Sequence, residues 1–416
     1  MSDSTYLNNA LLRSKLSNLM SAGSSVRAPG HLGPLTVVVT ANEVNDRHGT
    51  GPLVRRVLAG RKPVLSIRSR DHWGMHEFGE SHFMLSHQGL TRRQSFERVI
   101  AAVGGRQIQS VLCVPYLIDE LLTAIALHDV FDAPLCAYVM DDQNVATKGI
   151  PDDLMREFLD KCEIRFATHP ELCEAYRKKF GHPFYILPAV VPDQLVARTQ
   201  VDYAPPASGM RFALLGSIWD QVWFDRLCDA MGRVGVKVDW FGNNKSPWRK
   251  FPAQQLREAG IVPRGVVPED QLVEELRSYP FVIVPMSMLD KTDSNRGVAA
   301  LSLPGRILFA AAGSHTPALI LGSPQTCGAR FVSHFEIGET ASYRAADIAI
   351  AIEKLTDPAR QAKYRRNAAR VGPLFSDAGV SDWLAQSIKQ GKPADTRFET
   401  AFAGYVERIG ELKTIE

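Results

Sequence analysis

Segments typical of β-strands alternate with segments typical of α-helices from residue 35 onward, and this alternation limits the possible folds more than any other feature. Parallel sheets arise in this way because a helix supplies the crossover between neighbouring strands. Short apolar runs predict strands at 35–40, 62–67, 110–114, 135–140, 165–168 and 183–187. Helical patterns occupy 51–58, 92–103, 117–128, 152–161 and 170–180. The sequence therefore predicts a doubly wound α/β domain over residues 35–195.

The same pattern restarts after a polar, turn-rich stretch at residues 197–210, where Pro205, Pro206 and Gly209 disfavour a helix or a central strand. Strands are predicted at 211–215, 237–241, 281–285 and 318–321, with helices at 223–234, 269–278, 306–312, 342–355 and 358–371. We therefore expect a second domain over residues 210–375. The predicted architecture is two Rossmann-like domains that face each other across a ligand cleft. The C-terminal helical segment, residues 376–416, could cross back to the first domain.

The first 34 residues form an N-terminal extension whose leucines follow a helical spacing. Leu7, Leu11 and Leu16 lie on one stripe with Arg13 and Lys15 beside it. One interpretation is a helix docked on the protein body. The other is a weak peripheral contact with a membrane, because a basic amphipathic helix can lie on anionic lipid.

The overall composition excludes several classes of protein. The 416 residues include 48 Lys and Arg against 45 Asp and Glu, so no strong positive field predicts nucleic acid as a partner. Six scattered cysteines indicate buried, reduced thiols. No apolar run approaches the roughly 18 residues of a membrane span, and no secretory signal precedes the first domain. We expect a cytoplasmic protein, with the inner face of the membrane as the alternative location.

In open parallel sheets, ligands bind beyond the carboxyl ends of the strands, which directs attention to the loops there. The loop after the first predicted strand ends in Gly49, Thr50 and Gly51 at a helix start. Glycines allow close backbone approach, and free N–H groups at a helix start favour an anion. The loop lacks the GxGxxG pattern, which disfavours a dinucleotide dehydrogenase. A simple glycine-rich turn is the alternative.

Two carboxylates, Asp141 and Asp142, follow the strand predicted at 135–140. Neighbouring carboxylates shift each other's pKa values, so this pair could act as a base, orient sugar hydroxyls or hold a cation. The alternative is an N-cap or a turn, which Asp commonly makes. We take both residues as catalytic candidates.

Residues 294–307 are the most informative loop of the second half. Pro304 suits the first turn of a helix, so that the N–H groups of Gly305 and Arg306 would point toward an anion. The guanidinium of Arg296 or Arg306 adds a positive charge and two N–H groups that can donate in parallel to one phosphate. A diphosphate fits this arrangement, and a helix start with solvated arginines is the alternative.

Two other loops are weaker candidates. Residues 71–77, with His82 and His87, carry metal-capable side chains but do not match HExxH, so we expect no metal there. Gly242 and Asn243 follow a predicted strand and could contact a base or a ribose, or could simply form a turn. The sequence contains neither a GxSxG motif nor a phosphate-binding GxxxxGK[ST] loop, which disfavours a serine hydrolase and a P-loop kinase.

The order of these segments resembles the retaining GT-B glycosyltransferases of the glycosyl transferases group 1 type, which use nucleotide sugars. The resemblance covers most of residues 35–390 and lies in order and spacing. It is carried by 214–219, 238–242, 302–307, 310–313 and 316–318 in the second half, and by 138–142 and 49–51 in the first. It implies two Rossmann-like domains, a nucleotide-sugar donor, and a saccharide or lipid-linked acceptor.

The resemblance also assigns roles to individual residues. It implies that Gly49 and Gly51 lie near the donor phosphates and that Gly216 and Ser217 line the cleft. The segment from Ser302 through Gly305 to Arg306 would hold the diphosphate. Such enzymes stabilise the leaving phosphate with cationic side chains and helix N-termini, so the resemblance implies no metal and no cofactor beyond the nucleoside-diphosphate sugar, which is a co-substrate.

Two positions depart from the pattern of these enzymes. Many relatives have two glutamates spaced eight apart around this helix, where this chain has Leu301 and Phe309. The basic residue often found after the Gly216 turn is also absent, so Arg296 and Arg306 would have to supply the positive charge. We expect a glycosyltransferase active in polysaccharide or glycolipid synthesis. The alternatives are a non-catalytic nucleotide-sugar binding protein of the same shape and a nucleotide-sugar epimerase.

Overall fold

The computed structural model describes residues 33–74, 78–203, 210–218, 220–243, 250–293 and 296–406. The predicted N-terminal helix lies outside these residues. The same holds for residues 204–209 of the predicted linker, for Asn244 and Lys245, for Ser294 and Asn295, and for the tail beyond residue 406. The described residues form two compact units.

The first unit contains the described residues up to Thr168 together with Cys173–Leu187 and Gly379–Thr396. Its seven strands are β1 (Leu35–Thr40), β2 (Val64–Arg68), β3 (Ser81–Met84), β4 (Ile108–Cys113), β5 (Leu135–Val139), β6 (Ile164–Ala167) and β7 (Tyr185–Ile186). Its helices are α2 (Thr50–Val57), α3 (Arg92–Val103), α4 (Ile118–Phe131), α5 (Asp152–Asp160), most of α6 (Pro170–Phe180), and α15 (Val380–Gln390).

The strands of this unit form one parallel sheet in the order β3-β2-β1-β4-β5-β6-β7. Strand β5 is buried along its whole length, as expected for a strand covered on both faces. Helices α3, α4 and α5 contact one another, and α15 packs against α2. Arg61 bonds Ser381 and Asp382 of α15, so this late helix belongs to the first unit.

The second unit contains Pro188–Ala378, His169–Leu172 and the described residues from Arg397. Its strands are β8 (Phe212–Leu215), β9 (Val238–Phe241), β10 (Ile261–Gly265), β11 (Val282–Pro285), β12 (Ala318–Leu321) and β13 (Gly338–Ala341). Its α-helices are α7 (Gln221–Val234), α8 (Ala253–Glu258), α9 (Glu269–Arg277), α10 (Arg296–Ala300), α11 (Gly305–Ser314), α12 (Cys327–Phe335), α13 (Ala345–Thr356), α14 (Pro358–Val371) and α16 (Arg397–Ala401). Two short 3₁₀ helices are η1 (Asp193–Leu195) and η2 (Gly372–Phe375).

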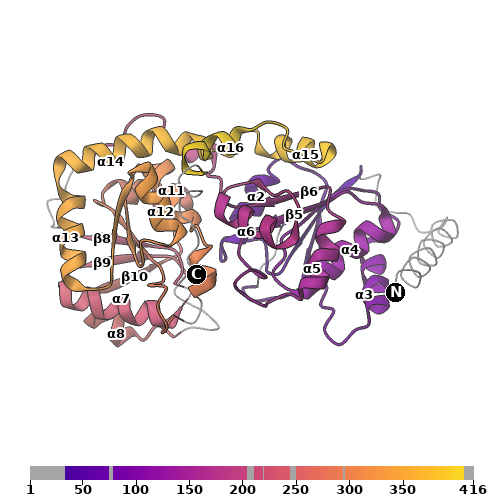
Figure 1. Ribbon diagram of the computed structural model, residues 1–416, viewed down its shortest axis with the longest axis horizontal. Coiled ribbons are helices and arrows are strands. Elements are labelled where there is room, and N and C mark those ends of the chain that lie inside the picture. Colours follow the sequence, from indigo (N-terminus) through magenta and orange to yellow (C-terminus); the bar gives the residue numbers. More distant parts are fainter. Residues whose placement is uncertain are drawn as a thin grey trace. The chain divides into compact units, whose positions relative to one another are not determined.

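The second sheet is also parallel, in the order β10-β9-β8-β11-β12-β13. Helices α7, α8 and α13 form one contacting group and α9, α11 and α14 another, and Figure 1 shows helices flanking the strands in each unit. The core between sheet and helices includes Phe212, Trp223, Phe224, Trp240 and Phe281. The prediction of two doubly wound parallel-sheet domains is confirmed.

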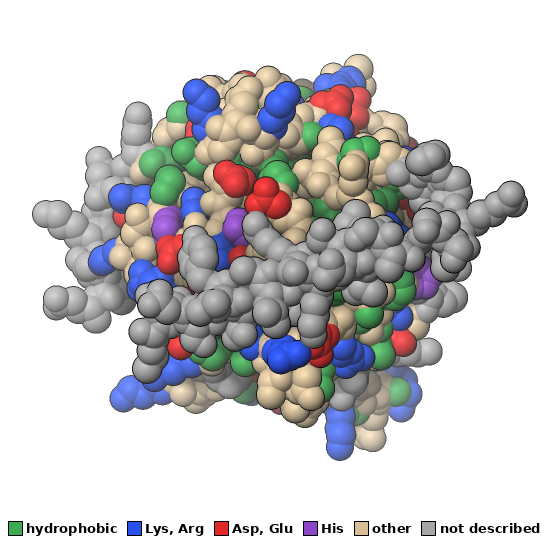
Figure 2. Space-filling view, turned by 90° about the vertical axis from the view of Figure 1, so that its right-hand side faces the viewer, with side chains coloured by type: hydrophobic (Ala, Val, Ile, Leu, Met, Phe, Trp, Pro, Cys, Tyr) green, Lys and Arg blue, Asp and Glu red, His purple; other side chains and the backbone are tan. Residues whose placement is uncertain are grey.

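The chain passes from the first unit to the second between Leu187 and Pro188, earlier than the predicted linker. The backbone N–H of Val191 bonds Phe375, and that of Ala197 bonds Ala312, so this stretch packs on the second unit. The six cysteines are free and buried. The face in Figure 2 shows basic and acidic side chains side by side, consistent with the nearly balanced total charge.

One helical segment, Arg296–Ser314, is long and apolar enough to cross a membrane, with a mean hydropathy of 1.3. It consists of α10 and α11 separated by non-helical residues before Gly305. Every residue of α11 from Ile307 to Ser314 is buried inside the second unit. Helix α11 is therefore a core element of the second α/β domain.

Candidate functional site

Each sheet reverses its strand order at one place. In the first unit this place lies between β1 and β4, and in the second it lies between β8 and β11. Loops that leave neighbouring strands at such a point run in opposite directions, and open α/β sheets bind their ligands there, beyond the carboxyl ends of the strands. Most of the residues singled out from the sequence lie in loops at these two edges.

A chain of hydrogen bonds joins three loops at the carboxyl edge of the first sheet. Thr50 at the start of α2 donates from Oγ1 to the Tyr116 hydroxyl over 3.2 Å. The Tyr116 hydroxyl donates to Oδ2 of Asp141 over 2.7 Å. These residues follow β1, β4 and β5, and the alternating topology brings them together although they are 66 and 25 positions apart in sequence.

The environment adjusts the proton affinity of Asp141. Burial raises the pKa of Asp141, while the hydrogen bond from Tyr116 and the nearby His48 oppose that rise. Burial lowers the pKa of His48 and raises the pKa of Tyr116 well above its usual value, so the tyrosine stays protonated and acts as a donor. The His48 ring meets the Tyr116 ring edge-on at 6.4 Å. Such a carboxylate is suited to accept a proton.

A buried glutamate fixes the position of Tyr116. Oε2 of Glu120 accepts the backbone N–H groups of Tyr116 at 3.2 Å and Leu117 at 2.6 Å, and Oε1 accepts the Ser69 hydroxyl. Burial raises the pKa of Glu120 to about 7 despite these hydrogen bonds. Glu120, in the first turn of α4, thus holds the loop after β4 in place.

Asp142 has a different role from its neighbour. It is 1% exposed, and its two carboxylate oxygens accept the backbone N–H groups of four successive residues, 144–147, at 2.7–3.2 Å. This is the turn-forming alternative raised from the sequence. Every oxygen of this carboxylate is occupied by its own loop, so we retain Asp141 alone as the candidate proton acceptor.

The two glycines at the start of α2 are constrained differently. A Cβ atom on Gly51 would lie 2.0 Å from the backbone oxygen of Asn45, so the close fold of the loop excludes any side chain. Gly49 is exposed at the helix start, with open space where a Cβ would be. Gly51 therefore serves the shape of the loop, and Gly49 is the one with room beside its backbone for a ligand.

The histidine-rich loop after β2 is organised by a carboxylate. Oε1 of Glu43 accepts the N–H groups of His72, Trp73 and Gly74 at 2.6–2.8 Å. His87 is buried and lies 2.8 Å from the Thr123 hydroxyl through Nε2. Among the described residues of this loop, no group of His, Cys, Asp and Glu converges closely enough to hold a metal ion.

At the carboxyl edge of the second sheet, Arg306 lies beneath the turn after β8. Its Nη1 donates to the carbonyl oxygens of Leu215 at 2.8 Å and Ser217 at 2.6 Å. Gly216 between them has φ +85°, and a Cβ there would meet the guanidinium at 2.7 Å. Burial lowers the pKa of Arg306 to about 10, so it remains charged near neutral pH. The sequence-predicted Gly216, Ser217 and Arg306 are thus brought together.

The remaining predicted residues lie along the entrance to α11. Pro304 occupies the N-cap position and offers no side-chain cap to the first turn of α11, while the N–H of Ile307 bonds the carbonyl oxygen of Pro304 at 3.0 Å. A Cβ on Gly305 would lie 2.8 Å from the Cβ of Ala189. The close packing against Ala189 therefore favours glycine at this position. Ser302 is buried in the connection before the helix, and Arg296 is exposed at the start of α10.

Sequence reasoning missed a network beside this edge. Asp293 is buried and accepts hydrogen bonds from the Ser287 hydroxyl, from Trp223 Nε1 at 3.2 Å and from Arg226 Nη1 at 3.1 Å. These hydrogen bonds join the loop after β11 to helix α7. It also missed Tyr116, although a Pro-Tyr pair directly after a buried strand could have indicated it.

Comparison with solved structures identifies the architecture. HepE from Anabaena in complex with UDP-glucose is similar with a TM-score of 0.62 and 13% identity, covering 86% of this chain and 100% of that one. The chain has the GT-B fold. Two further GT-B structures are Os79 from O. sativa in complex with a trichothecene (TM-score 0.54, 12% identity, 84% and 100% covered) and the Thermobaculum terrenum O-GlcNAc transferase (0.50, 13%, 92% and 74%).

No protein-family model matches the sequence, and no curated protein does. This chain has the GT-B fold although its sequence is only 12–13% identical to these structures. Identities this low establish the fold alone. The fold that the sequence resemblance implied is confirmed.

Proposed function

We propose that this protein is a glycosyltransferase that moves a sugar from a nucleoside diphosphate to a hydroxyl group of a glycan or glycolipid. The observation that carries the proposal is the Thr50–Tyr116–Asp141 chain of hydrogen bonds at the switch point of a GT-B first domain. GT-B neighbours support the donor class, since HepE has been solved with UDP-glucose and with UDP and glucose.

We place the donor diphosphate at the entrance to α11 in the second domain. The N–H groups of Gly305 and Arg306 lie at the start of this helix, where the positive end of the helix dipole favours an anion. Arg306 Nε is buried and has no hydrogen-bond partner in the described part of the chain. A phosphate oxygen would satisfy this donor, because buried polar groups are nearly always paired. Arg296, Ser302, Gly216 and Ser217 complete the proposed donor set.

We place proton transfer at Asp141 in the first domain. As the acceptor oxygen forms its bond to the anomeric carbon, its proton passes to the Asp141 carboxylate, and the sugar–phosphate bond breaks with the electron pair going to the diphosphate. Tyr116 holds the carboxylate in position, and Gly49 leaves room beside α2. The positive groups at α11 stabilise the leaving phosphate, so we propose that no metal and no further cofactor take part in the transfer.

The stereochemical outcome separates two versions of this proposal. The sequence resemblance implies retention at the anomeric carbon, whereas a carboxylate that accepts the proton of the acceptor hydroxyl favours a single displacement with inversion. The coupling constant of the anomeric proton in the product, measured by NMR at early times, decides between them. We further propose that the protein acts in the cytoplasm or at the inner membrane face, where its buried thiols remain reduced.

The decisive experiment is transfer by Asp141→Asn across a panel of nucleotide sugars. We expect transfer to fall by about 10²-fold or more while nucleoside-diphosphate affinity is unchanged. Asp153→Asn, an exposed aspartate at the start of α5, is the matched control and should keep full activity. Unchanged transfer by Asp141→Asn would remove Asp141 from the mechanism. Nucleotide binding without any product, with authentic acceptors present, would instead indicate a binding protein.

A further inference from the structure

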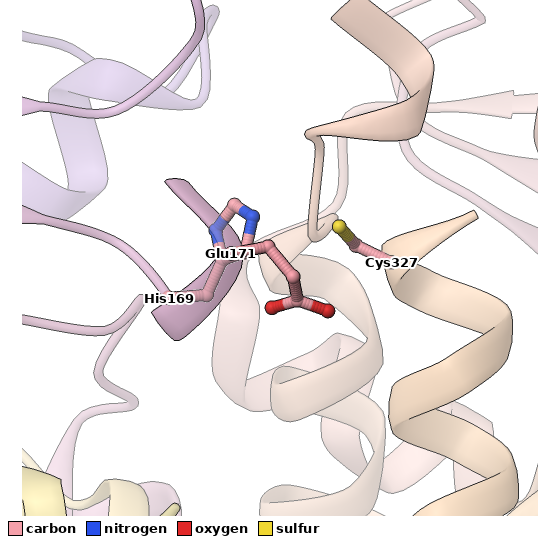
Figure 3. Close-up of side chains that lie close together, drawn as sticks. All are labelled: His169, Glu171 and Cys327. Carbon is pink, nitrogen blue, oxygen red and sulfur yellow. The ribbon is translucent and has the colours of Figure 1, made fainter. Parts of the chain in front are cut away.

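Three side chains with metal-binding atoms converge in the second unit. His169 directly precedes α6, Glu171 lies in its first turn, and Cys327 is the first residue of α12. Figure 3 shows them pointing toward one another. One ligand atom from each lies within 4.8 Å of the others, and the three residues are 0–7% exposed.

The hydrogen bonds of Glu171 leave one of its oxygens available. Oε1 receives the Tyr405 hydroxyl and the Arg330 guanidinium, whose Nη2 lies 3.2 Å away. Oε2 is buried and has no hydrogen-bond partner among the residues that the structure describes. A buried carboxylate oxygen without a donor is costly, so its presence next to an imidazole and a thiol requires an explanation.

The donor set matches one metal in particular. Imidazole nitrogen, thiolate sulfur and carboxylate oxygen are the ligands of Zn²⁺, whereas Mg²⁺ and Ca²⁺ take oxygen ligands. In a tetrahedral zinc site the ligand atoms lie roughly 3.3–3.8 Å apart. Shifts of about 1 Å or less would therefore bring the three atoms into that geometry.

A cavity lies beside two of the residues that contact Glu171. Its volume is about 760 Å³, and its lining includes Arg330 and Tyr405, the two residues that contact Glu171. In zinc sites with three protein ligands a water molecule takes the fourth position.

We propose that His169, Glu171 and Cys327 bind one Zn²⁺ through a ring nitrogen, Oε2 and Sγ. On binding, the Cys327 S–H bond breaks, the Zn–S bond forms, and the proton leaves to solvent. With thiolate and carboxylate as ligands, the site carries two negative charges against the one positive charge of Arg330, which also donates to Sγ at 3.2 Å. The dication therefore meets a net negative site.

The cluster also contacts the chain just before the proposed donor residues. Cys327 Sγ donates to the carbonyl oxygen of Ala300 at 2.9 Å, and His169 has a hydrogen bond with the backbone of Leu301. Ser302 follows directly. The zinc proposal does not depend on the glycosyltransferase proposal, because its readout is metal binding and not turnover.

The test is zinc titration of the full-length protein after chelator treatment, with a chromophoric chelator as competitor. We expect one equivalent of tightly bound Zn²⁺. Cys327→Ser and Glu171→Gln should each weaken binding by about 100-fold or more. Cys228→Ser, a buried cysteine of α7 in the same unit, is the matched control and should bind as the natural sequence does. Circular dichroism of each variant checks its folding.

Cobalt gives a readout that needs no variant. Co²⁺ bound to the unaltered protein should show a thiolate-to-metal charge-transfer band in the near ultraviolet, and Zn²⁺ should displace it. Failure of the unaltered protein to bind zinc, absence of the thiolate band, or an equal loss in Cys228→Ser would each overturn the proposal. The cluster would then be a closed polar network in which Arg330 neutralises Glu171.

Discussion

At the scale of single residues, burial decides what each carboxylate can do. Asp141 and Asp142 are adjacent, yet Asp142 accepts the N–H groups of its own loop, while Asp141 accepts the Tyr116 hydroxyl and interacts with the charge of His48. Glu120 behind them is fully buried, and its pKa of about 7 makes it titrate near neutral pH.

Glu120→Gln should remove a pH dependence of stability. The folded pKa of Glu120, about 7, lies above the usual value of 4.5, so the folded state holds a proton that the unfolded state releases between those values. Its contribution to stability is therefore complete below about pH 4.5 and is lost as the pH rises through 7. We expect the unaltered protein to lose about 3 kcal/mol of unfolding free energy between pH 5 and pH 8 relative to Glu120→Gln. Urea denaturation at both pH values measures this difference, and parallel curves for the two proteins would contradict it.

Asp142→Ala should destabilise the first unit by about 3 kcal/mol, because it leaves several backbone N–H groups of a buried turn without acceptors. Asp142→Asn, which keeps one acceptor oxygen, should lose less. Asp153→Ala, an exposed change nearby, provides the baseline in the same urea series. A loss for Asp142→Ala no larger than that baseline would show that the loop does not depend on this carboxylate.

At the scale of elements, the buried strands were predictable and several edge strands were not. Buried strands such as β1 and β5 carry unbroken apolar runs, which are visible in the sequence. The edge strands β3, β10 and β13 are polar or partly exposed, and β10 contains Pro263, so their sequences resemble loops. Their positions are fixed by pairing with the neighbouring strand, which a single sequence does not reveal.

The same limit applies to the candidate site. The sequence indicates which strand ends carry polar residues, and Asp141 and Gly216 are candidates for that reason, whereas Arg306 is a candidate because it lies at a predicted helix start. It could not indicate that Tyr116 meets Asp141, because that contact depends on β4 and β5 being neighbours in the sheet. For the same reason the convergence of Cys327 with Glu171 was missed, since the two residues are 156 positions apart in sequence.

The start of α2 offers a matched pair of glycine substitutions. Gly51→Ala places a Cβ 2.0 Å from the Asn45 oxygen and should cost about 2–3 kcal/mol of unfolding free energy, because the backbone must move. Gly49→Ala enters open space at φ −56° and should be neutral or stabilise by up to about 1 kcal/mol. Thermal and urea unfolding measure both. Equal effects of the two substitutions would show that the loop is not packed as described.

At the scale of the whole molecule, the two sheets share one plan. In both, the first six strands follow the order 3-2-1-4-5-6 when numbered within the sheet, so each has one switch point with polar groups beside it. Similarity to HepE over 86% of the chain, at 13% identity, supports this shared plan as a GT-B fold. We propose that the second of these domains binds a nucleoside diphosphate at the entrance to α11.

The most direct test of this claim is calorimetric and thermal-shift titration of the full-length protein with UDP, GDP, ADP and dTDP. We predict that at least one nucleotide binds, and that at about 100 times its dissociation constant it raises the unfolding free energy by about 2.7 kcal/mol. Arg306→Ala should weaken this binding by about 1.5–3 kcal/mol, and the exposed Arg366→Ala on α14 should not. Absence of binding by all four nucleotides, or equal affinity of Arg306→Ala and the unaltered protein, would contradict the account.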